Sequence, residues 1–145
     1  MKRFLCVCLG NICRSPLAEG ILRKVAADAG VAIHVESAGT ANYHVGSKAD
    51  RRSIEIGNLN KVDINLHRAQ QFQANHFDRF DYILVMDENN ERDVLRLARN
   101  ETDKAKVFFY DPNRNTVEDP YYGDHSDFEK MYRHLEMYAK HWVEK

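Results

Sequence analysis

The stretch CVCLGNICRSP, from Cys6 to Pro16, constrains this chain more than any other feature. It follows an apolar segment, Lys2 to Val7, that is typical of a short buried strand. It leads into SPLAEGILRKVAADAG, where Leu17, Ile21, Val25 and Ala29 recur at four-residue spacing and predict an amphipathic helix. Chemically distinctive residues therefore fall in a strand-to-helix turn, which is where α/β folds bind ligands.

The rest of the chain alternates between predicted strands and helices. Further strands are predicted at 31–35, 82–86 and 106–110. One helix is predicted from Ser15, near its N-cap, to Ala29, with Gly30 after its end, and a second from Ala49 to Ile56, ended by Gly57. A third helix is predicted after Asp87, with the apolar residues Val94, Leu95, Leu97 and Ala98. A last helix is predicted from Ser126, with Phe128, Met131, Leu135, Tyr138 and Trp142 on one stripe. This alternation predicts one domain over residues 1–145, with a parallel sheet covered by helices on both faces.

Composition excludes several classes of protein. The chain has 145 residues and a formal net charge of -1, which argues against a general binder of nucleic acid or acidic lipid. The apolar run near the start meets Gly10 and Asn11 before it reaches the length of a secretion signal, and no later stretch is long enough to cross a bilayer. We therefore expect no membrane insertion and a cytoplasmic location.

The first turn carries the chemistry of a phosphate site. A helix N-terminus supplies backbone N–H groups without helical partners and a partial positive charge, which together bind anions. Gly10 and Asn11 are residue types that accept left-handed backbone, and Arg14 offers a planar fork for two phosphate oxygens. Cys8 begins this turn, where the same groups favour thiolate, so a phosphocysteine intermediate becomes available, with Ser15 placed to donate a hydrogen bond to the sulfur.

The other two cysteines have different expected roles. Cys13 lies close enough in the turn to form a reversible disulfide with Cys8 after oxidation. Cys6 is expected to be a small buried hydrophobe on the strand. Zinc binding by the three cysteines is disfavoured, because no paired cysteine or nearby histidine completes a tetrahedral set, and no metal site or cofactor is predicted.

A phosphocysteine route also needs an acid for the leaving oxygen and then a base for water. The segment EDPYYGD offers Asp119, with Pro120 to stiffen the loop and Tyr121 and Tyr122 as an aromatic wall. On general grounds an Asp-Pro pair is an ordinary turn, and periodicity alone does not bring Asp119 near Cys8.

Taken together, VCLGNICRSP near the start and DPYYG near the end resemble the low-molecular-weight protein tyrosine phosphatases, in length and motif order over nearly the whole chain. The resemblance implies a four-stranded parallel sheet flanked by helices and hydrolysis of phosphotyrosine without metal. It implies Cys8 as nucleophile, Arg14 as phosphate clamp and Asp119 as general acid and later base. The expected backbone cradle is Leu9, Gly10, Asn11, Ile12, Cys13, Arg14 and Ser15.

The resemblance also assigns a supporting network and a rim. Ser37 and His67 match a serine and a histidine that fix the loop asparagine, although each residue taken alone would pass for an ordinary turn or surface residue. Asp87 matches a family aspartate near the site, and a helix N-cap explains it equally well. Tyr43 and His44 would line the rim opposite Tyr121 and Tyr122. The segment before His67 departs from the family, which often has a shorter glycine-rich approach and an arginine in place of Gln70.

Three other functions are compatible with such a loop. A thiol-dependent arsenate reductase would relay electrons through late cysteines; this chain has none after Cys13, so an external thiol would have to substitute. A phosphocarrier subunit of a sugar transport system would not need Asp119 or an aromatic wall. A catalytically silent phosphotyrosine-binding module is disfavoured because nucleophile, clamp and acid candidates are all present. The expected partners are phosphotyrosine-containing proteins, with a bacterial tyrosine kinase as one candidate, and the chain is expected to be monomeric or weakly self-associating.

Overall fold

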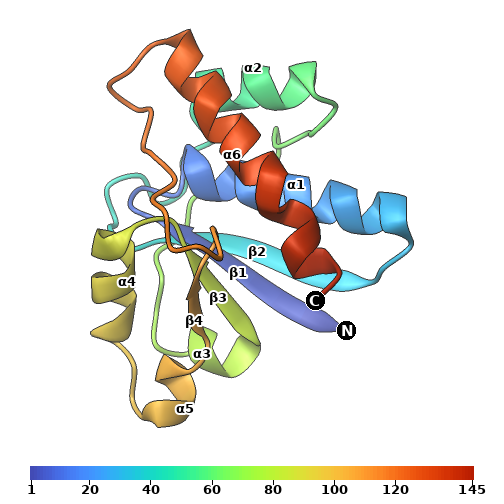
Figure 1. The fold of residues 1–145 in the computed structure, drawn as a ribbon. Coiled ribbons are helices and arrows are strands. Elements are labelled where there is room, and N and C mark those ends of the chain that lie inside the picture. Colours follow the sequence, from blue (N-terminus) through green and yellow to red (C-terminus); the bar gives the residue numbers. More distant parts are fainter.

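Four parallel strands form one sheet in the computed structural model, which describes residues 1–145 (Figure 1). The strands are β1 (Lys2–Cys8), β2 (Ile33–Gly39), β3 (Tyr82–Val85) and β4 (Val107–Phe109), in the spatial order β2-β1-β3-β4. β1 pairs with β2 on one side and with β3 on the other. The chain therefore leaves β1 toward one side of the sheet and later continues on the other side, so the strand order reverses at β1. The end of β1, at Cys8, is therefore the point of the sheet where a ligand crevice is expected.

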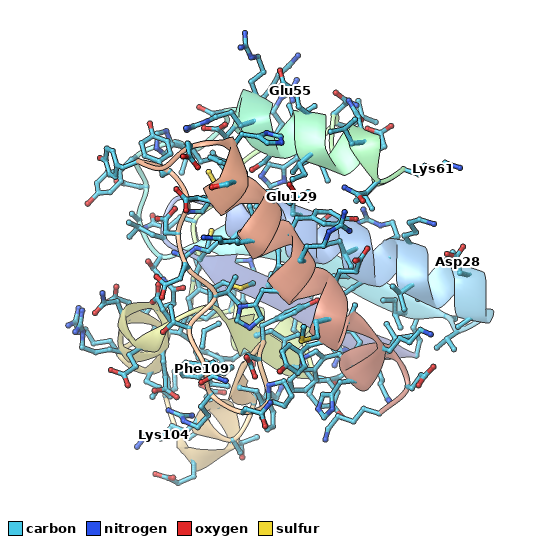
Figure 2. The ribbon with its side chains drawn as sticks, turned by 45° about the horizontal axis from the view of Figure 1, so that its top comes forward. Asp28, Glu55, Lys61, Lys104, Phe109 and Glu129 are labelled. Atoms are coloured by element: carbon cyan, nitrogen blue, oxygen red, sulfur yellow. The ribbon has the colours of Figure 1, made fainter.

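Helices cover both faces of the sheet, which confirms the predicted fold class. One face carries α1 (Arg14–Ala29), α2 (Arg51–Leu59) and α6 (His125–Val143), and the other carries α3 (His76–Arg79), α4 (Glu88–Leu95) and α5 (Glu101–Lys104) (Figure 1). Charged side chains lie on the outer surface, as Figure 2 shows for Asp28, Glu55 and Glu129. None of the helices combines the length and apolar character needed to span a bilayer.

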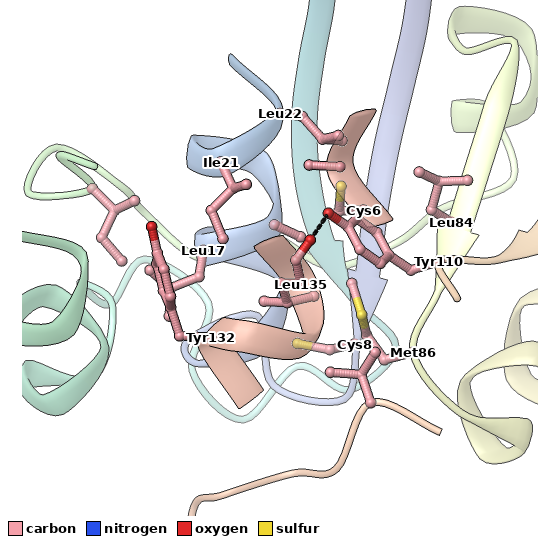
Figure 3. Packing of buried hydrophobic residues seen from close by; sticks show 14 of the residues in the cluster. Cys6, Cys8, Leu17, Ile21, Leu22, Leu84, Met86, Tyr110, Tyr132 and Leu135 are labelled. Carbon is pink, nitrogen blue, oxygen red and sulfur yellow. Dashed lines mark hydrogen bonds between the residues drawn. The ribbon is translucent and has the colours of Figure 1, made fainter. Parts of the chain in front are cut away.

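The side chains of β1 alternate between two cores. Phe4, Cys6 and Cys8 pack with residues of α1 and α6, whereas Leu5 and Val7 pack on the opposite face of the sheet. Figure 3 shows the larger core, in which Leu17, Ile21 and Leu22 of α1 meet Leu84, Met86, Tyr110 and Leu135. Cys6 is fully buried there, as predicted.

Two hydrogen bonds fix α6 on the sheet. The Tyr110 hydroxyl donates to the carbonyl oxygen of Leu135 at 2.6 Å, the dashed contact in Figure 3. The indole N–H of Trp142 donates to the carbonyl oxygen of Tyr110 at 2.7 Å. Because both donors are buried, each needs such a partner, and the register of α6 over β4 follows from them.

The structure corrects several predicted strand boundaries. The second strand was predicted at 31–35 but spans Ile33–Gly39, because β1 pairs with it as far as Cys8 opposite Gly39. Ser37 is therefore a strand residue and not part of a turn. The strand predicted at 82–86 ends one residue earlier, at Val85. The strand predicted at 106–110 is shorter by one residue at each end and spans Val107–Phe109.

Helix boundaries also differ from the predictions. The N-cap of α1 is Cys13, so Ser15 lies inside its first turn. Gly57 lies within α2 and does not end it, because its φ is not left-handed as a helix-ending glycine's would be. A Cβ at this position would lie 2.6 Å from the Val62 carbonyl oxygen. Helix α4 ends at Leu95, before Leu97 and Ala98. The four-residue helices α3 and α5 were not predicted, since segments this short carry no periodicity.

Candidate active site

A pocket of about 130 Å³ lies at the carboxyl end of β1. It brings together residues from both ends of the chain: Cys8, Leu9, Gly10, Ile12, Cys13, Arg14, Tyr43, His44, Asp119, Tyr121 and Tyr122. The structure thus places the two sequence motifs in one site, which periodicity alone could not do. The predicted residues Asn11, Ser15, Ser37, His67 and Asp87 do not line the pocket and lie behind or beside it.

The loop between β1 and α1 offers a row of backbone donors without protein partners. No backbone N–H group from Leu9 to Ser15 donates a hydrogen bond to another group of the chain. Cys13, the N-cap of α1, makes no capping hydrogen bond through its side chain, and α1 has no acidic residue in its first turn. Unpaired amides at an uncapped helix N-terminus form an anion-binding cradle.

A chain of hydrogen bonds connects this loop to the Cys8 sulfur. Asn11 Nδ2 donates one proton to Ser15 Oγ at 2.7 Å and the other to Ser37 Oγ at 3.0 Å. Ser37 in turn donates to Glu19 Oε1 at 2.7 Å. The Ser15 hydroxyl, having accepted from Asn11, is free to donate to Cys8 Sγ at 3.0 Å, with the Ala38 carbonyl oxygen farther away at 3.5 Å. Ser15 therefore points a proton at the thiolate form of Cys8.

Asn11 holds the bend of the loop. Its φ angle of 58° is left-handed, while Gly10, also expected to adopt such backbone, has no positive φ. The side-chain oxygen of Asn11, Oδ1, accepts from the backbone N–H of Gln70 at 2.9 Å. The backbone carbonyl oxygen of Asn11 lies 2.7 Å from His67 Nε2. Every polar atom of the Asn11 side chain is thus paired, which offsets the cost of the left-handed conformation.

His67 takes part in this network as a neutral donor. Because a carbonyl oxygen only accepts, Nε2 must carry the proton that faces Asn11. Burial lowers the pKa of His67, and this effect outweighs the Asn11 carbonyl and Glu19, which both favour the charged form. His67 therefore contacts the loop asparagine, as the resemblance implied, and is not the surface residue that it would pass for on its own.

Arg14 is buried and directed into the pocket. Its Nη1 donates to Asp87 Oδ2 at 2.8 Å and to the Val117 carbonyl oxygen at 2.9 Å. Its Nε and Nη2 donate no hydrogen bond within the chain, although Nη2 lies 3.7 Å from Asp119 Oδ2. One edge of the guanidinium is thus anchored, and the other is available for two oxygens of a ligand.

Asp87 serves two purposes at once. Its Oδ1 accepts from the backbone N–H of Asn90 at 2.7 Å and caps α4, while Oδ2 binds Arg14. Burial alone would lower the pKa of Arg14, but Cys8, Asp87 and Asp119 outweigh it and raise that pKa, so Arg14 stays charged. The two interpretations of Asp87 from the sequence, helix cap and site residue, are both supported by this geometry.

Asp119 stands at the mouth of the pocket, with its side chain 42% exposed. Its Oδ1 accepts from the backbone N–H of Tyr121 at 3.1 Å. Val117, two residues earlier, is bound through its carbonyl to Arg14 and through its N–H to the Met86 carbonyl oxygen. The loop that carries Asp119 is therefore anchored to Arg14 and to the residue that follows β3.

Aromatic rings form the rim. The Tyr121 ring packs edge-on against Tyr122, and His44 lies between Tyr43 and Tyr121. Tyr43 and Tyr122 are exposed, so the rim is accessible from solvent.

Burial raises the pKa of the Cys13 thiol, which also lines the pocket, well above its usual value, so Cys13 remains protonated at neutral pH.

Several residues around the site had no predicted role in it. Glu19 and Gln70 complete the Asn11 network, and Arg52 contacts the Asp119 loop. Gly39 matters for close approach, since a Cβ there would come within 2.8 Å of the Leu9 carbonyl oxygen. The contacts of these residues are made by partners far apart in the sequence, which no local pattern indicates. No group of three or more His, Cys, Asp or Glu side chains is arranged to hold a metal ion.

Comparison with known proteins supports one family. The family model "Low molecular weight phosphotyrosine protein phosphatase" matches residues 3–145. A relative of the same description from Gallus gallus is 41% identical over 152 residues, which cover 100% of this chain and 96% of the relative.

Solved structures agree with this match. A protein tyrosine phosphatase from Entamoeba histolytica, with Hepes in its active site, superposes with a TM-score of 0.93 at 32% identity, covering 100% of this chain and 96% of that one. Wzb from Vibrio vulnificus, in complex with benzylphosphonate, superposes with a TM-score of 0.88 at 28% identity, covering 99% and 97%. The likeness therefore extends over the whole sheet and both motif-bearing loops.

Proposed function

This chain belongs to the low molecular weight phosphotyrosine protein phosphatases, and on that premise we propose that Cys8 attacks the phosphate, Arg14 clamps it and Asp119 moves the proton. The chain is a hydrolase of this cysteine-dependent family. The observation that carries the residue roles is the row of unpartnered backbone donors from Leu9 to Ser15, in a stretch that lines the same pocket as Cys8 and the Arg14 side chain. A thiolate inside an anion cradle is poised against phosphorus.

In the first step the Cys8 thiolate forms a bond to phosphorus as the bond to the phenolic oxygen breaks. The loop amides and the free edge of Arg14 bind the equatorial oxygens, where negative charge is greatest in the transition state. The Asp119 carboxylic acid gives its proton to the departing oxygen, so that a neutral phenol leaves.

In the second step water attacks the phosphocysteine. Asp119, now a carboxylate, takes a proton from that water, and the Cys8 sulfur leaves as a thiolate. The Ser15 hydroxyl, 3.0 Å from the sulfur, stabilises the negative charge that returns to it. Inorganic phosphate then departs, and Asp119 is again protonated for the next cycle.

The rim supports an aromatic phosphate ester carried on a protein. The Tyr121 and Tyr122 rings offer a wall for a flat leaving group, and benzylphosphonate, an aromatic phosphonate, is bound by the Vibrio vulnificus relative. Exposed Tyr43 and Tyr122 leave the mouth open to a phosphotyrosine on a protein surface. We infer that the substrates are phosphotyrosine proteins of the cytoplasm, with a bacterial tyrosine kinase as one candidate. We also propose that the reaction needs no cofactor and that the chain acts as a monomer or with weak self-association.

The position of Asp119 also separates this proposal from its rivals. A phosphocarrier or a binding module has no need for a carboxyl group 3.7 Å from the phosphate clamp. An arsenate reductase would need further thiols, and the only other cysteines, Cys6 and Cys13, are buried in the same region. Hydrolysis is the reaction that uses all the groups present.

Turnover of p-nitrophenyl phosphate at mildly acid pH, with chelator present, tests the residue roles. We expect Cys8→Ser to abolish turnover, and Asp119→Ala to slow it by about 10²-fold while phosphate still binds as an inhibitor. Glu118→Ala, an exposed carboxylate next to Asp119, is the matched control and should behave as wild type. Normal turnover by Cys8→Ser, or arsenate-dependent oxidation of a thiol by the wild type, would contradict the proposal.

A further inference from the structure

Arg52, in the first turn of α2, contacts the loop that carries Asp119 at Tyr121, two residues after the acid. Its Nη2 donates to the Tyr121 carbonyl oxygen at 3.0 Å. Its guanidinium carbon lies 5.6 Å from the centroid of the Tyr121 ring and 4.4 Å from that of Phe128. Arg52 thus holds both the backbone and the ring of Tyr121.

The geometry of Arg52 is fixed by Asp50. Arg52 Nε donates to Asp50 Oδ1 at 3.0 Å and Nη2 donates to Oδ2 at 2.9 Å, which makes a bidentate pair. The Asp50 side chain is only 12% exposed and also caps α2 by accepting from the backbone N–H of Arg52. Because both carboxylate oxygens of Asp50 bind the Arg52 guanidinium, the Arg52 side chain has little freedom to move away from Tyr121.

Asp50 also binds the phosphate loop. Its backbone N–H donates to the Ile12 carbonyl oxygen at 2.8 Å. Contacts therefore run from Ile12 through Asp50 and Arg52 to Tyr121, and they join the loop of the nucleophile to the loop of the acid.

The Asp119 loop is consequently held at two points. Val117, before Asp119, is bound by Arg14 at 2.9 Å, and Tyr121, after it, is bound by Arg52. The Asp119 carboxyl lies between them and accepts from the Tyr121 N–H, so a displacement of Tyr121 displaces the carboxyl. We propose that Arg52 is a positioning residue for the acid step, an inference that rests on the proposed role of Asp119.

The neighbouring Arg51 provides a matched control. Its side chain is 88% exposed and its ion-pair partner is Glu55, 3.3 Å away, which Figure 2 shows on the outer side of α2. Arg51 and Arg52 share charge, size and helix, but only Arg52 reaches the Asp119 loop. A change in overall charge or helix propensity would affect both positions alike.

The test is kcat/KM for a series of aryl phosphates with increasingly basic leaving groups. Protonation by Asp119 matters most when the leaving oxygen is a strong base. We expect Arg52→Gln to lose about tenfold with phenyl phosphate but only about twofold with p-nitrophenyl phosphate, since a misplaced acid fails where it is most needed. Arg51→Gln should follow wild type across the series. A partly unfolded variant would lose the same factor for every substrate, so the trend separates positioning from stability.

The double variant Arg52→Gln/Asp119→Asn decides whether Arg52 acts through Asp119. We expect it to show the same leaving-group dependence as Asp119→Asn alone. An equal loss for all substrates in Arg52→Gln, or a steeper dependence in the double variant than in Asp119→Asn, would overturn the inference. If Asp119→Asn itself does not steepen the series, the proposed role of Asp119 fails and the role of Arg52 fails with it; if only Arg52→Gln does not, Arg52 alone is excluded.

Discussion

At the scale of single residues, Asn11 holds the bend of the loop between β1 and α1. Its left-handed backbone turns the loop, and its side chain binds Ser15, Ser37 and the Gln70 N–H. The sequence predicted the need for such a residue, because few residue types other than glycine accept this conformation. It could not predict Gln70 as a partner, since that contact is made by a backbone group.

Substitution of Asn11 should separate strain from bonding. We expect Asn11→Ala to lower the free energy of unfolding by about 3 kcal/mol, because it keeps the left-handed φ and leaves buried partners unpaired. Asn11→Gly should lose about 1 kcal/mol less, since glycine accepts this φ without strain. Urea unfolding measures both values. Equal losses would show that the backbone of the loop is not strained.

His67 gives the same network a dependence on pH. Its pKa is lowered in the folded protein by burial, so between the lowered value and the ordinary value of about 6.5 the unfolded chain binds more protons. The stability contributed by neutral His67 is therefore complete above about pH 6.5 and is lost as the pH falls through the folded pKa. Below that point the histidine must be charged at a cost, or leave Asn11.

We therefore expect His67→Gln to lose less stability on acidification than wild type. Glutamine can still donate an amide proton toward the Asn11 carbonyl but does not titrate. Urea unfolding at about pH 7.5 and about pH 5 would measure the two losses. His76, whose pKa burial also lowers, is present in both proteins and cancels in the comparison. Identical losses would exclude His67 as the titrating group.

At the scale of elements, the boundaries that the sequence missed were set by partners distant in the chain. β2 extends to Gly39 only because β1 offers paired backbone as far as Cys8. The glycine at position 57 was predicted to end the helix, but it lies inside α2 and leaves room for the Val62 carbonyl, which comes from the chain beyond the helix. In contrast, the helices of the longest periodic segments, α1 and α6, were predicted closely, since their apolar stripes reflect burial directly.

Gly57 is a test of that explanation. Alanine favours a helix over glycine by about 1 kcal/mol. Even so, we expect Gly57→Ala to lower the free energy of unfolding by about 1–3 kcal/mol, because its Cβ would meet the Val62 carbonyl oxygen at 2.6 Å. Asn58→Ala, at the next and exposed position of α2, is the control and should change stability by less than about 0.5 kcal/mol. A more stable Gly57→Ala would show that the approach of Val62 is not needed.

At the scale of the whole molecule, the fold joins the two ends of the chain in one site. Cys8 ends the central strand, and Asp119 follows β4 on a loop that returns over that strand end. Local patterns predicted the sheet and the phosphate loop, but only the resemblance to a family predicted that Asp119 would meet Cys8. The contacts that do so, from Arg14 to Val117 and from Arg52 to Tyr121, join residues far apart in sequence and leave no local signal.

The central claim is that hydrolysis passes through a phosphoryl group on Cys8. The direct measurement is rapid acid quench of the enzyme during turnover of p-nitrophenyl phosphate, followed by intact-mass analysis and peptide mapping. We expect a protein that is heavier by one phosphoryl group, with that group on Cys8, and none in Cys8→Ser. Asp119→Ala should hold more of it if the variant slows hydrolysis of the intermediate most. A phosphoryl group on another residue, or steady turnover without any phosphorylated protein, would contradict it.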